Sequence, residues 1–359
     1  MRLIPAFLLL AAACGHSEPY TTAPTSTDGP FGAAVPTRLT YNSLTDSAAS
    51  LTSDGQGLFY LYTGFANGDR CIGLLPTGGG SRRWELCDTR FEAADSSKSF
   101  SAPALASDGR LLYVQALALR GRWNPDRTTL WLADSALPLQ RRALISFPIN
   151  VAGRGVSWLT DAQWTGPESF VARAGLLDVA RPCDSCRYDT TVAATGIVRG
   201  TITPTGAMLG FVAGADDARL HAFAEGGASI VYTREQTPAS ILVTRESPAI
   251  FRVATTGGTP TVIGTLPTSA RVTGLSCRGS DCVVTQLNGL VARLGGPVIG
   301  SADGTHVFRI RLATNAIDLL TTVPGLWAGP VVLPTGGDVV MQASTTPSRD
   351  LYLFKGLIP

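Results

Sequence analysis

Seven cysteines are the residues of this chain with the widest chemistry, because a thiol can form a disulfide, bind a metal or act as a nucleophile. Six of them form three local pairs: Cys71 and Cys87, Cys183 and Cys186, and Cys277 and Cys282. An even number of cysteines, paired nearby in an exported chain, predicts disulfides. The first and third pairs each flank a turn, which predicts that the two cysteines of a pair lie on neighbouring strands.

The pair Cys183 and Cys186 leaves several chemistries open, because Cys-x-x-Cys is also a redox and a metal motif. A thioredoxin-like dithiol needs its first cysteine at a helix start, and no helical period is visible here. A zinc site would have to add the distant pair Cys277 and Cys282, with no histidine nearby. We predict a structural disulfide. The alternatives are redox chemistry, zinc binding and free thiols, and no metal site is expected.

Other catalytic groups are sparse. None of the three histidines, His16, His221 and His306, has a nucleophile motif such as Gly-x-Ser-x-Gly beside it. His221 alternates with apolar residues, which predicts a satisfied structural histidine in a strand. The acidic pair Asp216 and Asp217 follows a glycine, which predicts a solvated turn. We therefore expect a protein that is not an enzyme, with no catalytic residues and no cofactor.

The elements that must position these residues are repeated. Six turn glycines recur at intervals of 52 to 61 residues, each followed by a short apolar run: Gly55, Gly109, Gly166, Gly227, Gly279 and Gly337. A period of this length, carried by strand–turn–strand units, predicts an all-β propeller. Six blades is the prediction and seven the alternative, because the segment 204–206 imitates a further repeat start but is interpreted as an outer hairpin.

The first two turns resemble a known repeat. The triplets Ser53-Asp54-Gly55 and Ser107-Asp108-Gly109 resemble the Ser-Pro-Asp-Gly units of TolB-type, WD-like propellers, and Pro103 matches their leading proline. Three later segments resemble the third strand of that repeat: Leu130–Asp134, Ile250–Val253 and Val307–Leu312. The resemblance covers residues 38–359 and implies a six-bladed β-propeller. It implies no ligand, because several copies depart from Ser-Asp-Gly.

The two ends of this region predict how the ring closes. Residues 38–42 resemble the outer strand of a blade, yet they precede the first complete copy. The last copy ends at Leu351–Phe354. Pairing of these two segments would complete the sixth blade and remove an exposed sheet edge.

The amino terminus predicts export and a lipid anchor. Residues 1–13 combine Arg2, an apolar run too short to span a bilayer and three alanines, which is typical of a signal peptide. The cysteine that follows, Cys14, resembles the lipidated residue of bacterial lipoproteins; an ordinary signal peptide is the alternative. Residues 14–37, rich in Ser, Thr, Pro and Gly, predict a tether for a propeller at 38–359.

These features favour an extracytoplasmic binding or scaffold module for a protein, peptide or glycan, attached to the membrane only through its lipid and expected to be a monomer. Net charge is +2 and basic residues are scattered, so no nucleic acid partner is expected. By resemblance, Gly15 after the lipidated cysteine implies the outer membrane, on its periplasmic side or at the cell surface. The alternative is a six-bladed enzyme resembling quinoprotein sugar dehydrogenases or lactonases, disfavoured because the expected inner strands at 101–106, 272–277 and 328–333 are small and apolar.

The Cys14→Ala variant tests the anchor. In a bacterial host, we expect the wild-type chain to begin at Cys14 and to partition with detergent-extracted membranes. The variant should be soluble in the exported fraction or remain unprocessed, whereas a Ser17→Ala control should stay with the membrane. Intact mass of the mature chain is the measurement, and an unmodified chain that starts at Gly15 would contradict lipidation while leaving export intact.

Overall fold

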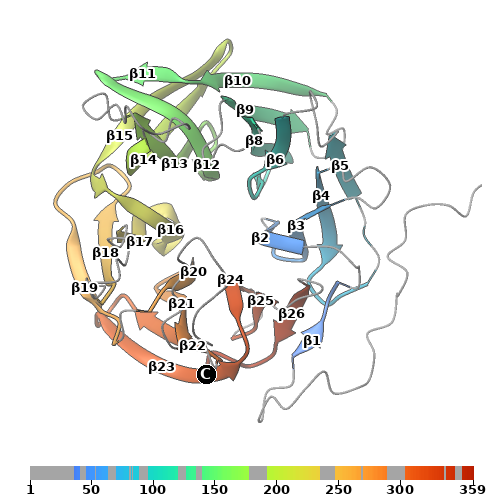
Figure 1. The fold of residues 1–359 in the computed structure, drawn as a ribbon, viewed down its shortest axis with the longest axis vertical. Coiled ribbons are helices and arrows are strands. Elements are labelled where there is room, and N and C mark those ends of the chain that lie inside the picture. The colour runs from blue at the N-terminus through green and yellow to red at the C-terminus, as the bar shows by residue number, and fades with distance from the viewer. Residues whose placement is uncertain are drawn as a thin grey trace, which may run out of the picture.

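The computed structural model describes residues 36–40, 46–52, 54–63, 70–80, 82, 84–88, 96–119, 127–134, 140–177, 192–234, 247–267, 270–288, 304–334, 337–343 and 350–359. Six antiparallel sheets stand in a ring around a central axis (Figure 1), so the chain is an all-β, six-bladed propeller. The predicted six blades are confirmed. The seven-blade alternative is wrong, because the segment 204–206 joins two strands of one blade, as the outer-hairpin interpretation required.

In blades 1 to 3 the chain order of the strands runs from the axis outward, apart from a divided first strand in blade 2 and an additional strand in blade 3. Blade 1 contains β2 (Asp46–Leu51), β3 (Gly57–Thr63), β4 (Arg70–Pro76) and β5 (Trp84–Asp88). Blade 2 contains β6 (Ser96–Phe100), β7 (Ala104–Leu105), β8 (Arg110–Leu119), β9 (Arg127–Asp134) and β10 (Arg141–Phe147). Blade 3 contains β11 (Ile149–Val151), β12 (Arg154–Gly166), β13 (Ser169–Leu177), β14 (Val192–Thr203) and β15 (Gly206–Asp216).

The remaining blades repeat the order, and the last one borrows its outer strand from the amino-terminal side of the chain. Blade 4 contains β16 (Ala218–Ala224), the 3-10 turn η1 (Glu225–Gly227), β17 (Ser229–Arg234), β18 (Ala249–Ala254) and β19 (Thr261–Thr265). Blade 5 contains β20 (Val272–Arg278), β21 (Asp281–Asn288), β22 (Gly304–Arg311) and β23 (Ala316–Pro324). Blade 6 contains β24 (Trp327–Val332), β25 (Val339–Ala343), β26 (Leu351–Phe354) and β1 (Thr37–Arg38).

The second strand of each blade is mostly apolar because both of its faces are covered by neighbouring blades; single polar residues, such as Gln115 in β8, interrupt the apolar run. In β3, Leu58 and Tyr60 pack toward blade 6, whereas Phe59 between them packs toward blade 2. The described core accordingly divides into six clusters, one at each contact between adjacent blades. Burial of apolar surface, at about 25 cal/mol per Å², therefore joins blades to one another as well as strands within a blade.

The six repeated glycines mark the turn between the first and second strands of every blade, at 51–57, 105–110, 166–169, 224–229, 278–281 and 332–339. Gly55 needs its missing side chain: its φ is +70°, and a Cβ there would lie 1.9 Å from Cγ of Pro334 in blade 6. Asp54 and Asp108 each accept a hydrogen bond from the backbone N–H two residues on, at 3.0 and 3.1 Å. These two Ser-Asp-Gly triplets are therefore hairpin turns, as predicted.

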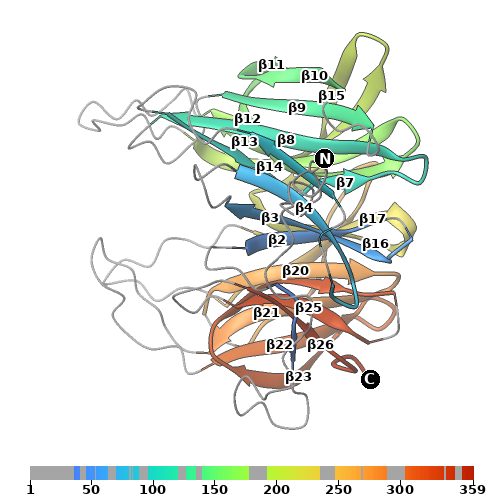
Figure 2. The ribbon, with the colours of Figure 1, turned by 90° about the vertical axis from the view of Figure 1, so that its right-hand side faces the viewer.

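The two faces of the ring differ. We call the face with these turns the turn face, and the opposite face, where second strands end and third strands begin, the loop face (Figure 2). On the turn face, successive strands are joined by a few residues. On the loop face, larger numbers of residues separate the second and third strands, for example between Leu177 of β13 and Val192 of β14.

The ring closes through β1, which pairs with β26 in the register Thr37 with Leu353 and Arg38 with Tyr352. The predicted closure is confirmed, although the strand starts at Thr37, which the sequence had placed in the tether, and residues 41 and 42 lie outside the described part. The pairing continues at Leu39, whose N–H donates to the carbonyl of residue 351 over 2.7 Å.

An ion pair fixes this edge. Arg38 lies 2.6 Å from the carboxylate of Asp350, which is 1% exposed, and its Nε donates to the carbonyl of Thr40. The Thr40 hydroxyl in turn accepts from the backbone N–H of Leu351 over 3.0 Å. A buried carboxylate requires such partners, so the two ends of the propeller depend on each other.

Deleting residues 36–40 should lower the free energy of unfolding by several kcal/mol or cause aggregation, because the edge of β26 would lose its partner and Asp350 its cation. Deleting residues 16–34, a longer cut on the same side of the chain, should leave the melting temperature unchanged. Thermal and urea unfolding of the two variants is the measurement. Equal effects of the two deletions would contradict closure by β1.

Candidate functional site

Two of the three predicted cysteine pairs are disulfides. Cys71 on β4 is bonded to Cys87 on β5, and Cys277 on β20 is bonded to Cys282 on β21. The cysteines of each pair stand opposite each other in the strand register, with Cα atoms 4.1 and 4.0 Å apart. The two bonds fit a chain that folds in an oxidising compartment. The remaining cysteines lie outside the described residues: Cys14, Cys183 and Cys186.

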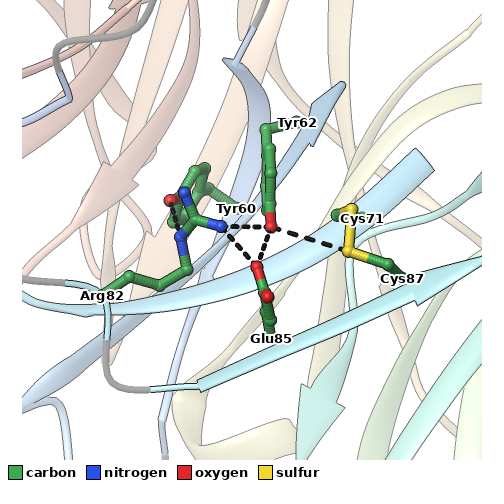
Figure 3. Close-up of polar contacts among 6 residues, drawn as sticks. All are labelled: Tyr60, Tyr62, Cys71, Arg82, Glu85 and Cys87. Carbon is green, nitrogen blue, oxygen red and sulfur yellow. Dashed lines mark hydrogen bonds and ion pairs between the residues drawn. A yellow bond between two sulfur atoms is a disulfide. The ribbon is translucent and has the colours of Figure 1, made fainter. Parts of the chain in front are cut away.

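Beside the first disulfide, a polar cluster holds the outer part of blade 1 together (Figure 3). Arg82 donates from Nε to the hydroxyl of Tyr60 over 2.9 Å, and its guanidinium lies 4.1 Å from the ring centroid of Tyr62. Glu85 accepts from Arg82 and from the Tyr62 hydroxyl, which also lies 3.7 Å from Sγ of Cys87. These groups satisfy one another's hydrogen bonds. Because Tyr60 also packs toward blade 6, we interpret the polar cluster as structural support for the contact between blades 6 and 1.

The other residues considered from the sequence are separated in space. Asp216 pairs with Arg154 over 3.2 Å and Asp217 has a φ of +60°, so the predicted acidic turn is confirmed. His306 lies on β22 with Nδ1 2.8 Å from the Thr322 hydroxyl. His221 on β16 is buried as expected, but its Nε2 has no hydrogen-bond partner among the described residues, so the expectation of a fully satisfied histidine is wrong. His16 lies outside the described part of the chain.

A cleft of about 250 Å³ on blade 2 is the strongest candidate site. Its lining comes from all four positions of the blade: β6, β8, β9 and β10. The polar and aromatic lining residues are Lys98, Gln115, Arg127, Thr129, Trp131 and Ser146. Strand pairing brings them to one face, because Thr129 stands opposite both Gln115 and Ser146. These positions lie near the loop face, where β8 ends and β9 begins.

The carboxylate of Asp88 on β5 of blade 1 reaches the edge of this cleft and orients two of its residues. Lys98 Nζ lies 3.2 Å from Asp88 Oδ1, the Gln115 amide donates to Oδ2, and Arg141 lies 3.7 Å from Oδ2. Burial by itself raises the pKa of Asp88, but the hydrogen bonds from Gln115 and Lys98 and the charges of Lys98 and Arg141 lower it below its ordinary value. Asp88 therefore stays ionised at neutral pH.

Charge and surface type define what the cleft can bind. Lys98 and Arg127 line the cleft, and Arg141 together with Lys98 lies close to the Asp88 carboxylate at its edge. Trp131 adds aromatic surface, with the Arg141 guanidinium 4.5 Å from its ring centroid. Cations beside hydroxyl and amide groups can bind an anionic group and neighbouring hydroxyls by charge-assisted and neutral hydrogen bonds.

This cleft was not predicted from the sequence, because its residues come from four strands that only the blade brings together. One signal was present: Arg127, Thr129 and Trp131 alternate along β9, while Thr128 and Leu130 between them are fully buried on the opposite side. Polar residues at alternate positions of a third strand indicate that one of its faces is not fully covered by the next blade.

Neither a metal centre nor a membrane span emerges from the part of the chain that the structure describes. Within it, no three His, Cys, Asp or Glu side chains gather at one point. No helix there is long and apolar enough to cross a bilayer.

No protein-family profile matches the chain, and no curated protein matches it in sequence. In structure it is similar to an oligogalacturonate lyase (TM-score 0.51, 12% identity, covering 93% of this chain and 96% of that one). It is also similar to a gluconolactonase of Xanthomonas campestris (TM-score 0.54, 12% identity, 90% of each chain). A TolB protein of Agrobacterium tumefaciens is among the further propellers found (TM-score 0.45, 13% identity, 74% of this chain and 76% of that one).

These likenesses show the fold and correct one expectation. The chain was expected not to be an enzyme, because a propeller without catalytic motifs suggested a binding module. The two propellers compared above with TM-scores over 0.5 are a lyase and a lactonase, so that expectation is overturned. At 12% identity the comparison transfers no activity to this chain.

The burial of His221 predicts a pH dependence of stability. Burial lowers the pKa of His221 to about 4, while Asp161 raises it and Arg173 lowers it further. The unfolded chain takes up a proton near the ordinary value of 6.5, whereas the folded chain does so only near 4. Stability should therefore fall between pH 6.5 and 4 by about 1.4 kcal/mol per pH unit, about 3 kcal/mol in all.

Urea unfolding of wild type and of His221→Phe at pH 7.0, 5.5 and 4.5 measures this effect. The variant should lose less stability on acidification than the wild type, and the control His306→Phe should keep the full slope. An unchanged slope in His221→Phe would assign the acid sensitivity to other groups.

Proposed function

We propose that this protein is an exported, lipid-anchored propeller whose blade 2 cleft binds an anionic glycan. The cationic cleft is the single observation that carries the proposal. Lys98 and Arg127 line the cleft, Arg141 lies at its edge beside Asp88, and the cleft also has an amide, two hydroxyls and an indole. A uronic acid or similar sugar presents the complementary set of groups, a carboxylate beside several hydroxyls.

The chemistry of the lining favours a saccharide over an acidic peptide. Gln115, Thr129 and Ser146 can each exchange hydrogen bonds with a sugar hydroxyl, and Trp131 provides the apolar surface against which a sugar ring can lie. The volume of about 250 Å³ lies below the range of roughly 300–1,000 Å³ for small-molecule sites, which suits one sugar unit at the end of a chain.

Anchoring would place the cleft near the envelope surface. Lipid on Cys14 and a tether over residues 14–36 would let the propeller move up to roughly 80 Å from the membrane. The proposed location is the outer membrane, on its periplasmic side or at the cell surface. The two disulfides support export, and the propeller is proposed to act as a monomer.

Calorimetric titration with uronic acid oligosaccharides tests this function. We expect binding to weaken with added salt, because exposed charges are screened, and to be absent for neutral oligosaccharides of the same length. Lys98→Gln should weaken binding roughly tenfold, the loss of one charge-assisted hydrogen bond. The control Lys355→Gln removes an exposed lysine elsewhere and should change nothing.

Titration with an acidic hexapeptide tests whether the anionic ligand is a glycan or a peptide. If the peptide binds as tightly as the oligosaccharide, the ligand is anionic but not a glycan. Equal binding of neutral and acidic saccharides, or unchanged affinity in Lys98→Gln, would contradict the assignment of the cleft.

A further inference from the structure

The disulfide between Cys71 and Cys87 lies one residue from the carboxylate that orients the blade 2 cleft. Cys87 and Asp88 are the last two residues of β5, and they stand opposite Cys71 and Arg70 of β4. β5 is the last strand of its sheet, so it pairs with a single neighbouring strand, β4. The end of such a strand opens easily unless a further bond holds it, and the disulfide supplies that bond.

The disulfide and the carboxylate act on different sides of blade 1. Leu86 packs in the apolar cluster between blades 1 and 2, and Asp88, two residues later, reaches the same side, where it contacts Lys98. Cys71 packs in the cluster between blades 6 and 1, and neither cysteine lines the cleft. The disulfide therefore affects the cleft only through the backbone that joins Cys87 to Asp88.

Asp88 connects the end of β5 to three strands of blade 2. Its Oδ1 lies 3.2 Å from Nζ of Lys98 on β6, and its Oδ2 accepts from the Gln115 amide on β8 and lies 3.7 Å from Arg141 on β10. Lys98 and Gln115 line the cleft, whereas Asp88 does not, so Asp88 is a positioning residue. The Lys98 ammonium has three N–H groups, so it can donate to Asp88 and to a ligand at the same time.

The two disulfides differ in access from the solvent. Cys87 is exposed and its partner Cys71 is 2% exposed, whereas Cys282 is fully buried and Cys277 is half-buried. A small dithiol can therefore approach the first bond from the Cys87 side. Its thiolate attacks Sγ of Cys87, the S–S bond breaks, and Cys71 leaves as a thiolate that takes up a proton. The second thiol of the reagent then displaces Cys87, so the protein gains two thiols and the dithiol becomes a disulfide.

We propose that the Cys71–Cys87 disulfide is a redox control of the blade 2 cleft. While it is intact it holds Asp88 against Lys98 and Gln115. On reduction by a small dithiol the end of β5 is released, the two side chains lose their fixed positions, and an anionic ligand binds more weakly.

Position rather than charge is the physical cause of this effect. Thiols are neutral at neutral pH for the most part, so reduction leaves the charge near the cleft unchanged. Side chains that are fixed before binding lower its entropic cost, and that advantage is lost when Asp88 moves. The binding part of this inference rests on the function proposed above, whereas the contact between Asp88 and Gln115 exists without any ligand.

The double variant Cys71→Ala/Cys87→Ala tests the control, and Cys277→Ala/Cys282→Ala, which removes the other disulfide, is the matched comparison. Calorimetric titration with trigalacturonate at pH 7 should show roughly tenfold weaker binding to the first variant and wild-type binding to the second. Reduction of the folded wild type by dithiothreitol should weaken binding equally, and peptide mapping should show the first bond reduced before the second. Equal affinity of the two double variants, when the wild type binds, overturns the proposal.

The side-chain amide of Gln115 reports the position of Asp88 without a ligand. In ¹⁵N-glutamine-labelled protein, with the signal assigned by Gln115→Glu, the hydrogen-bonded amide proton should move toward the shift of a free glutamine amide in Cys71→Ala/Cys87→Ala. In Cys277→Ala/Cys282→Ala it should stay in place.

These two measurements separate the control from the function. A wild type that binds no trigalacturonate contradicts the proposed function, and the Gln115 signal still tests the position of Asp88. If Cys71→Ala/Cys87→Ala does not fold, wild type reduced by dithiothreitol gives the same readout. A Gln115 signal that is unchanged after reduction, or a Cys71–Cys87 bond that dithiothreitol does not reduce in the folded protein, overturns the proposal.

Discussion

Ring closure is the constraint on which the rest of this protein depends. Each blade covers the faces of its neighbours, and the apolar cluster between blades 6 and 1 forms only when the ring closes. The outer edge of blade 6 is supplied by Thr37 and Arg38, and Arg38 forms an ion pair with the buried carboxylate of Asp350. One short strand thus couples the edge hydrogen bonds, an ion pair and an apolar interface.

The two faces of the ring differ in how their strands are connected, and this difference affects which side chains are covered. On the turn face the glycine turns are tight and pack against one another, as Gly55 does against Pro334. On the loop face more residues separate the second and third strands, and polar side chains of blade 2 are partly uncovered there. The blade 2 cleft occurs at this position, beside the end of β8 and the start of β9.

The blade 2 cleft and the inner strands of blades 3 and 4 differ in their electrostatics. In the cleft, Asp88 remains ionised because Gln115 and Lys98 donate to it, yet the cations exceed it in number. On the inner strands of blades 3 and 4, Arg173 and Asp161 carry opposite charges 3.9 Å apart, and burial keeps His221 neutral.

The periodic features of the fold followed from the sequence alone. The spacing of Gly55, Gly109 and their four counterparts determined the turns, the apolar runs after them determined the second strands, and the local cysteine pairs at 71/87 and 277/282 determined two disulfides. All of these are local patterns, which a short segment can express without knowledge of its neighbours. The sites were decided by tertiary structure. Lys98 meets Asp88 across two blades, and His221 meets Asp161 across two others. The burial of a side chain and its choice of partners are set only when separate blades come together. They therefore cannot be predicted from the spacing of residues along the chain.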